Sequence, residues 1–419
     1  LLVSFPGYSE HVIARFVNAS TADGYNPYRV TSEGFEWEVE EPDDPWSYIG
    51  YWGDHQIIYL LKLLELSERQ RPSALPGLLR REIFSYANVP YRIRPFEQLL
   101  ANPKKTVDYD EELADEIAQR VNRMGADGQL LLDANGQVYH VNLAEKLLVP
   151  LLAKLANLVP EGGIWLNTQR PEWNDANNAL VGNGLSMVTL YYIRRYLVFL
   201  QALLANEQAP VTLSSAVATW LRETAVAIDE AAAAMESGPL DDALRLQVTA
   251  RLGAIGAQYR EQLYRGDGLV GSTAVPVGDI DALLSQALRV VNHSIVRNRR
   301  DDGMYHAYNL LHRRDGELGV DHLYLMLEGQ VAALSSGAVG AEDAVALLQS
   351  MYASSLYRDD QQTFMLYPDR EPQPFLSRNR VPEEKVMAIP LLKTMLDNHD
   401  RRLIERDTGG DWRFNADLH

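Results

Sequence analysis

Apolar side chains recur at helical spacing over most of this 419-residue chain. In residues 106–124, Leu113, Ile117 and Val121 follow one another at every fourth position with charged residues between them, which predicts an amphipathic helix with one buried face. Residues 179–204 differ, because apolar side chains occur nearly all the way round this expected helix. Such a helix is enclosed by other protein. The pattern therefore predicts helices of two kinds, inner and outer.

The same reading predicts several more helices and few strands. Pro150 and Pro390 are expected to bend or break the segments that contain them. A short hairpin is expected over 128–141, with its turn at Asn135-Gly136, and a strand over 363–369. The further helices are expected at 54–68, 143–158, 214–235, 241–264, 279–291, 320–337, 341–356 and 382–397.

Inner and outer helices joined by long aromatic loops favour an all-α fold: an (α/α)6 toroid or barrel with at most minor β-hairpins. A long helical bundle is the alternative. The length exceeds that at which single cores usually stop growing, but closed toroids run larger as one unit. We therefore expect one domain over residues 1–419. The chain starts without methionine, so it is also interpreted as a piece of a longer polypeptide with flanking domains.

Composition narrows the classes of partner. Asp and Glu number 57 against 39 Lys and Arg, a formal charge of −18, which repels phosphate backbones and anionic lipids. Nucleic acid and membrane are therefore not expected as partners, and neutral sugars fit better. The chain has no cysteine, which excludes disulfides, thiolate catalysis and cysteine-ligated metals. No signal peptide and no apolar run of about 18 residues is visible, so a cytoplasmic location is expected.

Two segments have the same order of residue types. "YWGDH" (51–55) and "EWNDANN" (172–178) each place a Trp, one spacer and an Asp before an apolar stretch. One interpretation is that each Asp caps a helix. A helix N-terminus lowers a carboxyl pKa and so opposes proton donation. Burial beside an indole or a second acid would raise the pKa again.

The stretch "PEWNDANNALVGNG" resembles the segment that carries the catalytic acid in the cellobiose phosphorylase family, where a Trp-Asn-Asp triplet opens a helix at the centre of an (α/α)6 barrel. "YWGDHQ" is similar to the loop that lines the −1 sugar subsite in the wider six-hairpin glycosidase group, which includes trehalases and glucoamylases. "DDGMYHAYNLL" (301–311) more loosely resembles an aromatic sugar-binding loop of that group. The resemblance implies that Asp175 is the proton donor. It also implies substrate contacts from Trp52, Asp54, His55, Trp173, Asn174, Asn177, Asn178, Tyr305 and His306.

The chain departs from that family in two places. It has Ala176-Asn177-Asn178 where the family has a Gly-Met-Asn type of sequence, and no counterpart of the C-terminal phosphate-binding segment is found. Hydrolysis and phosphorolysis therefore both stay open, with inorganic phosphate as a second partner in the latter. An inverting hydrolase also needs a second carboxylate to activate water. Glu328 is our candidate for this base, with Asp302 and Glu383 as alternatives.

The sequence shows no pattern typical of a metal site or a nucleotide site. Neither His-carboxylate pairs at metal-ligand spacing nor a glycine-rich phosphate loop after a strand occur, so no metal and no cofactor are predicted. A cluster of arginines could form an anion site, although a solvated cluster that balances acids is the favoured interpretation; it comprises Arg297, Arg299, Arg300, Arg378 and Arg380.

Our leading hypothesis is a carbohydrate-active enzyme that cleaves or transfers a glycosyl unit with inversion, with Asp175 as general acid. The alternative is a non-catalytic toroid that binds saccharide or acts as a scaffold within a larger protein.

Overall fold

The computed structural model describes residues 4–26, 29–31, 34–44, 47, 49–51, 56–168, 182–236, 238–266, 269–369 and 379–415. The chain divides into two compact units, Leu1–Tyr367 and Pro368–His419, whereas the sequence predicts one domain over residues 1–419. Each unit has a hydrophobic core of its own.

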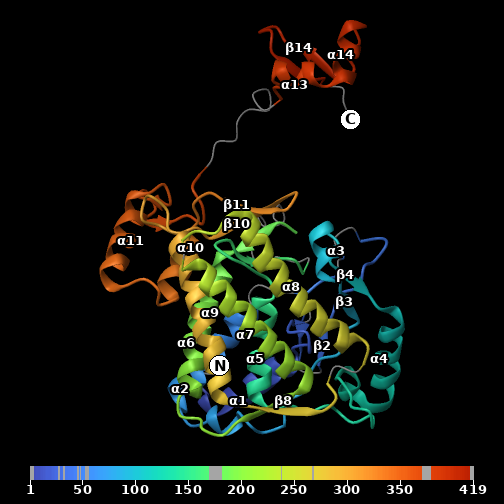
Figure 1. The fold of residues 1–419 in the computed structure, drawn as a ribbon, viewed down its shortest axis with the longest axis vertical. Helices are drawn as coiled ribbons and strands as arrows, with labels where there is room; N and C mark the ends of the chain where they lie inside the picture. The colour runs from blue at the N-terminus through green and yellow to red at the C-terminus, as the bar shows by residue number, and fades with distance from the viewer. Residues whose placement is uncertain are drawn as a thin grey trace. The chain divides into compact units, whose positions relative to one another are not determined.

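The first unit is built around long helices that lie side by side (Figure 1). Helix α5 is central, because every residue from Leu143 to Leu155 is buried, Pro150 included. Several helices begin after a side chain that accepts the N–H of the third helical residue, as Asp241 does for Leu244. The helices are α1 (Ser9–Asn18), α2 (Gln56–Gln70), α3 (Phe96–Ala101), α4 (Glu111–Met124), α5 (Leu143–Leu155), α6 (Met187–Leu204), α7 (Ser215–Met235), α8 (Asp242–Tyr264), α9 (Val277–Arg297), α10 (Leu327–Ser335) and α11 (Ala341–Ala353).

A five-stranded antiparallel sheet belongs to the same unit, in the order β11-β10-β7-β6-β5. Its strands are β5 (Leu158–Val159), β6 (Gly163–Trp165), β7 (Gly184–Ser186), β10 (Tyr308–Arg314) and β11 (Glu317–His322). Two-stranded ladders pair β1 (Arg29–Val30) with β2 (Phe35–Glu36), β3 (Tyr91–Ile93) with β4 (Val107–Tyr109), β8 (Val211–Ser214) with β9 (Ser272–Val275), and β12 (Tyr357–Arg358) with β13 (Thr363–Phe364).

The prediction of an all-α (α/α)6 toroid is therefore wrong, and the fold is mixed α/β. The physical reason lies in the strands that carry the sheet. β5, β6 and β7 are two or three residues long and buried throughout, so they show none of the alternation by which a half-buried strand is recognised. In a sequence pattern they look like loops between helices.

For other elements, the observed bounds differ from the predicted residue ranges. Residues 106–124 hold strand β4 and helix α4, which begins after the Asp110 cap. Residues 320–337 contain the end of β11 before α10 begins. The expected 128–141 hairpin is present as an isolated bridge between Leu132 and Val138, with Gly136 at a positive φ of 73°.

The second unit contains α13 (Glu383–Ala388), α14 (Pro390–Asp397), β14 (Ile404–Arg406) and β15 (Trp412–Phe414). Pro390 separates the two helices, as expected of a residue that cannot continue a helix. The core of this unit is small: Val386, Leu392 and Ile404 are buried in it, with Trp412 packed against them. Strands β14 and β15 form an antiparallel hairpin.

Candidate functional site

The two Trp-x-Asp segments lie outside the described residues, so the site is approached through the residues that flank them. Trp52, Asp54 and His55 fall within 52–55, and Trp173, Asn174, Asp175, Asn177 and Asn178 fall within 169–181. Tyr51 precedes the first segment, whereas Thr168 and Gly182 border the second. These three flanking residues are well defined by their hydrogen bonds.

Two hydrogen bonds join Tyr51 and Thr168, one between their main chains and one from the Thr168 side chain. The Tyr51 N–H donates to the Thr168 carbonyl at 3.2 Å, and the Thr168 hydroxyl donates to the Tyr51 carbonyl at 3.3 Å. Both residues are buried. The two motif-bearing segments therefore start from one place in the fold, although they are far apart in sequence.

The other end of the second segment is held by the five-stranded sheet. Gly182 accepts a hydrogen bond from the Trp165 indole N–H at 2.8 Å, and the Leu166 N–H donates to the Gly184 carbonyl at 2.9 Å. Strands β6 and β7 then pair through Trp165 and Leu185. Residues 169–181 thus connect the two strands of a buried antiparallel hairpin.

This hairpin corrects the expected start of the apolar helix. Helix α6 begins at Met187, and its cap is Ser186, whose hydroxyl accepts the Thr189 N–H at 2.9 Å. The carbonyl of Ala307 also accepts the N–H groups of Met187 and Val188. Asp175 is therefore not the N-cap of α6, because strand β7 separates it from the helix.

Stacked aromatic rings lie behind Tyr51. Its ring stacks on Tyr25 with centroids 5.1 Å apart and meets the edge of Tyr91 at 5.2 Å. The Tyr25 hydroxyl accepts a hydrogen bond from the Asn157 amide at 2.7 Å, and Asn157 in turn accepts one from the Asn167 amide at 2.9 Å. Asn167 directly precedes Thr168, so this buried chain of side chains fixes the backbone at both flanks.

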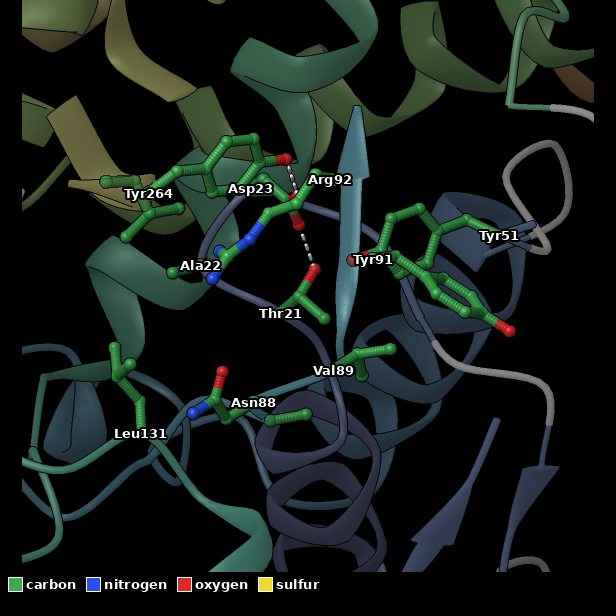
Figure 2. Close-up of a pocket in the computed structure, with 12 residues that line it drawn as sticks. Thr21, Ala22, Asp23, Tyr51, Asn88, Val89, Tyr91, Arg92, Leu131 and Tyr264 are labelled. Carbon is green, nitrogen blue, oxygen red and sulfur yellow. Dashed lines mark hydrogen bonds between the residues drawn. The ribbon is translucent and has the colours of Figure 1, made fainter. Parts of the chain in front are cut away.

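A buried carboxylate belongs to the same cluster (Figure 2). Asp23 accepts hydrogen bonds from the hydroxyls of Thr21 and Tyr264, the latter at 2.7 Å. Burial raises the pKa of Asp23, although the two hydroxyls oppose the increase. The cavity beside it, which Tyr51, Tyr91 and Arg92 help to line, has a volume of about 50 Å³. That volume suits a few water molecules and not a sugar ring. Asp23 therefore has a structural role as the acceptor for Thr21 and Tyr264 and is not itself a saccharide site.

Tyr305 and His306 lie at the N-terminus of α6. Tyr305 is buried, packs edge-on against Tyr191 at 6.1 Å, and exchanges two hydrogen bonds with Gln330. The His306 ring stacks on His322 with centroids 4.0 Å apart. Desolvation, followed by the His322 and Arg300 charges, lowers the pKa of His306 to about 4, so its imidazole is neutral near pH 7.

Glu328, the candidate base, is in the first turn of α10. The neighbouring Gly329 packs so tightly that a Cβ there would meet the Tyr305 carbonyl and the Ala307 nitrogen, both at 2.9 Å. The structure therefore brings Glu328 next to the segment that holds Tyr305 and His306. It does not describe Asp175, so the separation of the two carboxylates stays untested.

The other acids proposed as bases, and the described arginines of the predicted cluster, are engaged in ion pairs. Asp302 pairs with Arg300 at 2.8 Å. Partial burial acts to raise its pKa, but hydrogen bonds from Arg300 and the Met304 N–H outweigh this and lower it. Glu383 pairs with Arg406 in the second unit. The remaining pairs are Arg297–Glu161 at 3.8 Å, Arg299–Asp343 at 3.1 Å and Arg380–Asp411 at 3.1 Å, and Arg378 lies outside the described residues.

A buried polar network that the sequence analysis missed ties β10 to the β5–β6 turn. The Asn298 amide donates to the Glu161 carbonyl at 2.7 Å, the Asn309 amide donates to Asn298 at 2.8 Å, and His322 Nδ1 lies 2.8 Å from the Asn309 oxygen. Glu161 has a positive φ of 60°. Asn309 and His322 lie on β10 and β11. The sequence signal for this hairpin is the turn Asp315-Gly316 between two apolar runs.

Within the described ranges, no group of three or more His, Asp or Glu side chains is placed to hold a metal ion. Over the same ranges, none of the helices combines the length and apolar character needed to cross a membrane.

Comparison with known families bears on the second unit. Residues 372–419 match the family model of the GH149 phosphorylase insertion domain 2. This match, which covers residues 372–419 alone, points to a phosphorylase-type enzyme family. The narrower resemblance to the cellobiose phosphorylase family stays a prediction. No curated protein matches the chain.

Proposed function

We propose that the chain carries the acid and sugar-binding residues of an inverting glycoside phosphorylase, with Asp175 as the general acid. The single observation that best supports this is the pair of hydrogen bonds between Tyr51 and Thr168. It gives the two Trp-x-Asp segments a common starting point, as two segments that grip one saccharide require. The GH149 phosphorylase match favours phosphate over water as the second substrate.

In the proposed reaction, Asp175 donates its proton to the glycosidic oxygen as the bond to the anomeric carbon breaks. A phosphate oxygen attacks that carbon from the opposite face, which inverts its configuration. The products are a sugar 1-phosphate and a saccharide shortened by one unit. Phosphate replaces the base-activated water of a hydrolase, so this reaction does not require Glu328 as a base.

The side chains around Asp175 have proposed roles in binding. Trp52 and Trp173 offer indole faces on which sugar C–H groups stack, and Asp54 accepts hydrogen bonds from sugar hydroxyls. The polar contacts proposed beside them come from His55, Asn174, Asn177 and Asn178. Tyr305 and His306 are proposed to support the start of α6 from behind, since Tyr305 is buried and His306 is stacked on His322.

The test is phosphorolysis by the Asp175→Asn variant. The protein is incubated with neutral β- and α-linked disaccharides and inorganic phosphate, and sugar 1-phosphate is followed by ³¹P NMR. We expect the wild type to form sugar 1-phosphate and the variant to be slower by about 10²–10⁴-fold, the usual contribution of a general acid. Asp315→Asn, an exposed carboxylate in the β10–β11 turn, serves as the matched control and should keep wild-type turnover.

Two outcomes would contradict the proposal. Undiminished turnover by Asp175→Asn would remove Asp175 as the acid. Release of free sugar at a rate independent of phosphate, with loss of that activity in Glu328→Gln, would establish a hydrolase in which Glu328 is the base. Thermal unfolding of each variant verifies that the fold is intact.

A further inference from the structure

A second polar pocket lies on the first unit, and none of the residues that flank the two motifs is part of its lining. It is formed by the end of α1, the β1–β2 hairpin, Ser85 and the 3₁₀ helix η3 (Gly125–Gln129). Its volume is about 190 Å³, and it shares no lining residue with the cavity beside Asp23. This is smaller than the roughly 300–1,000 Å³ of sites for drug-sized ligands, which limits an occupant to about one ring.

The walls of the pocket are held by hydrogen bonds between its own elements. Arg15 donates to the Thr31 carbonyl and so ties α1 to the β1–β2 hairpin. Gln129 reaches the same hairpin from η3, because its amide donates to the Phe35 carbonyl at 3.1 Å and its oxygen lies 3.5 Å from the Phe35 N–H. The Asn18 oxygen accepts the Ser85 N–H at 3.0 Å. The pocket is thus built by side chains that already face one another.

Further polar groups line the pocket beside these bonds. They are the exposed carboxylate of Asp127, the amide nitrogen of Asn18 and the hydroxyl of Ser85. Together they offer an acceptor, a donor and a group that serves as either. Vicinal hydroxyls of a sugar each donate one hydrogen bond and accept others, so this set matches a polyol better than an ion.

The charge of the lining points the same way. Arg15 and Asp127 are the ionisable side chains among the lining residues, and their charges cancel. Phe35, Val30 and Leu130 supply apolar surface, on which the C–H face of a pyranose packs. An anion would meet Asp127, and the chain as a whole carries a formal charge of −18. A neutral ligand is therefore favoured.

We propose that this pocket is an accessory binding site for one neutral pyranose residue of a saccharide. Asp127 and Asn18 bind adjacent hydroxyls, and Phe35 with Val30 contacts the ring. The site takes part in no chemistry. This inference rests on the proposed function only for the expectation that a saccharide is the natural ligand. The pocket has its own lining residues and is tested by a separate experiment.

The experiment measures binding and its location together. Glucose, maltose and cellobiose are titrated calorimetrically into the Asp175→Asn protein, which prevents turnover. Hydrogen exchange of residues 29–36 and 125–130 is then compared with and without the sugar. We expect saccharide to slow exchange in both segments, and Asp127→Asn to weaken that local effect at least tenfold while leaving the fold unchanged. Asp115→Asn, exposed on α4, is the matched control and should bind as the parent does.

The results that would overturn this inference are distinct from failure of the proposed function. No saccharide-dependent protection at 29–36 and 125–130, or equal protection in Asp127→Asn, would remove the accessory site even if phosphorolysis proceeds. Protection by inorganic phosphate alone would replace a sugar site with an anion site. Conversely, local protection by sugar in a protein that lacks phosphorolysis would keep this site and remove the catalytic proposal.

Discussion

The Tyr264 hydroxyl donates a hydrogen bond to the Asp23 carboxylate at 2.7 Å, joining residues 241 positions apart. The same hydroxyl accepts the Ile93 N–H at 3.2 Å. One side chain at the end of α8 therefore ties together the loop after α1 and strand β3, and Asp23, Tyr91 and Tyr51 all line the same cavity (Figure 2).

Tyr264→Phe should destabilise the protein. The substitution leaves a buried carboxylate and a main-chain N–H each short of one partner, at a combined cost of about 1–3 kcal/mol. Urea unfolding measures this loss. Tyr352→Phe, an exposed tyrosine on α11, should change stability little, and equal effects of the two substitutions would contradict the assigned role.

The raised pKa of Asp23 makes a prediction about pH. Since burial raises its pKa above the ordinary value of 3.8, the folded state holds the proton more tightly than the unfolded state does. Stability contributed by this group is therefore present at low pH and falls as the pH rises through the folded pKa. Relative to Asp23→Asn, the wild type should gain stability as the pH is lowered through the folded pKa toward the ordinary value of 3.8. Parallel unfolding profiles for the two proteins would show that Asp23 does not titrate this way.

His306 predicts the opposite slope. Its pKa is lowered to about 4 from the ordinary 6.5, so the unfolded state binds the proton more readily. The stability it contributes is present above the ordinary value and is lost as the pH falls through about 4. His306→Gln should flatten this part of the stability profile. An NMR titration of the His306 ring with a midpoint near 6.5 would be inconsistent with the stacked, desolvated pair.

The buried pair of Arg245 and Glu161, 2.9 Å apart with each side chain 8% exposed, predicts a large effect on folding. Arg245→Met removes the buried guanidinium from the Glu161 carboxylate and leaves it the more distant, half-exposed Arg297 at 3.8 Å. Breaking a buried ion pair typically costs about 3–5 kcal/mol. Arg265→Met breaks the exposed Arg265–Glu261 pair and should cost at most about 1 kcal/mol. Chemical unfolding of both variants tests the contrast.

Thr168→Val tests whether the flank of the second motif segment matters for turnover. Valine keeps the shape of the side chain but removes the hydroxyl that donates to Tyr51. We expect a loss of about 0.5–1.5 kcal/mol in stability and roughly a tenfold fall in kcat/KM for phosphorolysis, because small displacements of reacting groups are costly. Thr363→Val, exposed on β13, is the control. Unchanged kinetics in Thr168→Val would separate this backbone contact from function.

The helices were largely accessible to sequence reasoning, and the sheet was not. The apolar pattern of 214–235 and 241–264 corresponds closely to α7 and α8, because long helices repeat their periodicity several times. Strands β5 and β7 have only two and three residues, too few to show a period of their own. β7 also pairs with β10, which lies far along the chain, and no local sequence pattern records such a pairing.

The same limit applies to the candidate site. The Trp-x-Asp segments were recognisable one at a time, from their residues. That Tyr51 is hydrogen-bonded to Thr168 is a tertiary fact, as is the burial of Tyr305, for which the resemblance implies a substrate contact. Asp127 and Asn18 were not singled out, since neither belongs to a motif, and only the packing of η3 against α1 and the β1–β2 hairpin sets them around one pocket.

The β6–β7 hairpin has an evolutionary consequence. Its strands and both bordering residues, Thr168 and Gly182, are held by bonds to the rest of the first unit. The bonds at the two ends of this connection are made by Thr168, Gly182 and the strands themselves, and they do not depend on the residues between those ends. Related proteins can therefore inherit the same scaffold while the connection changes in sequence or length.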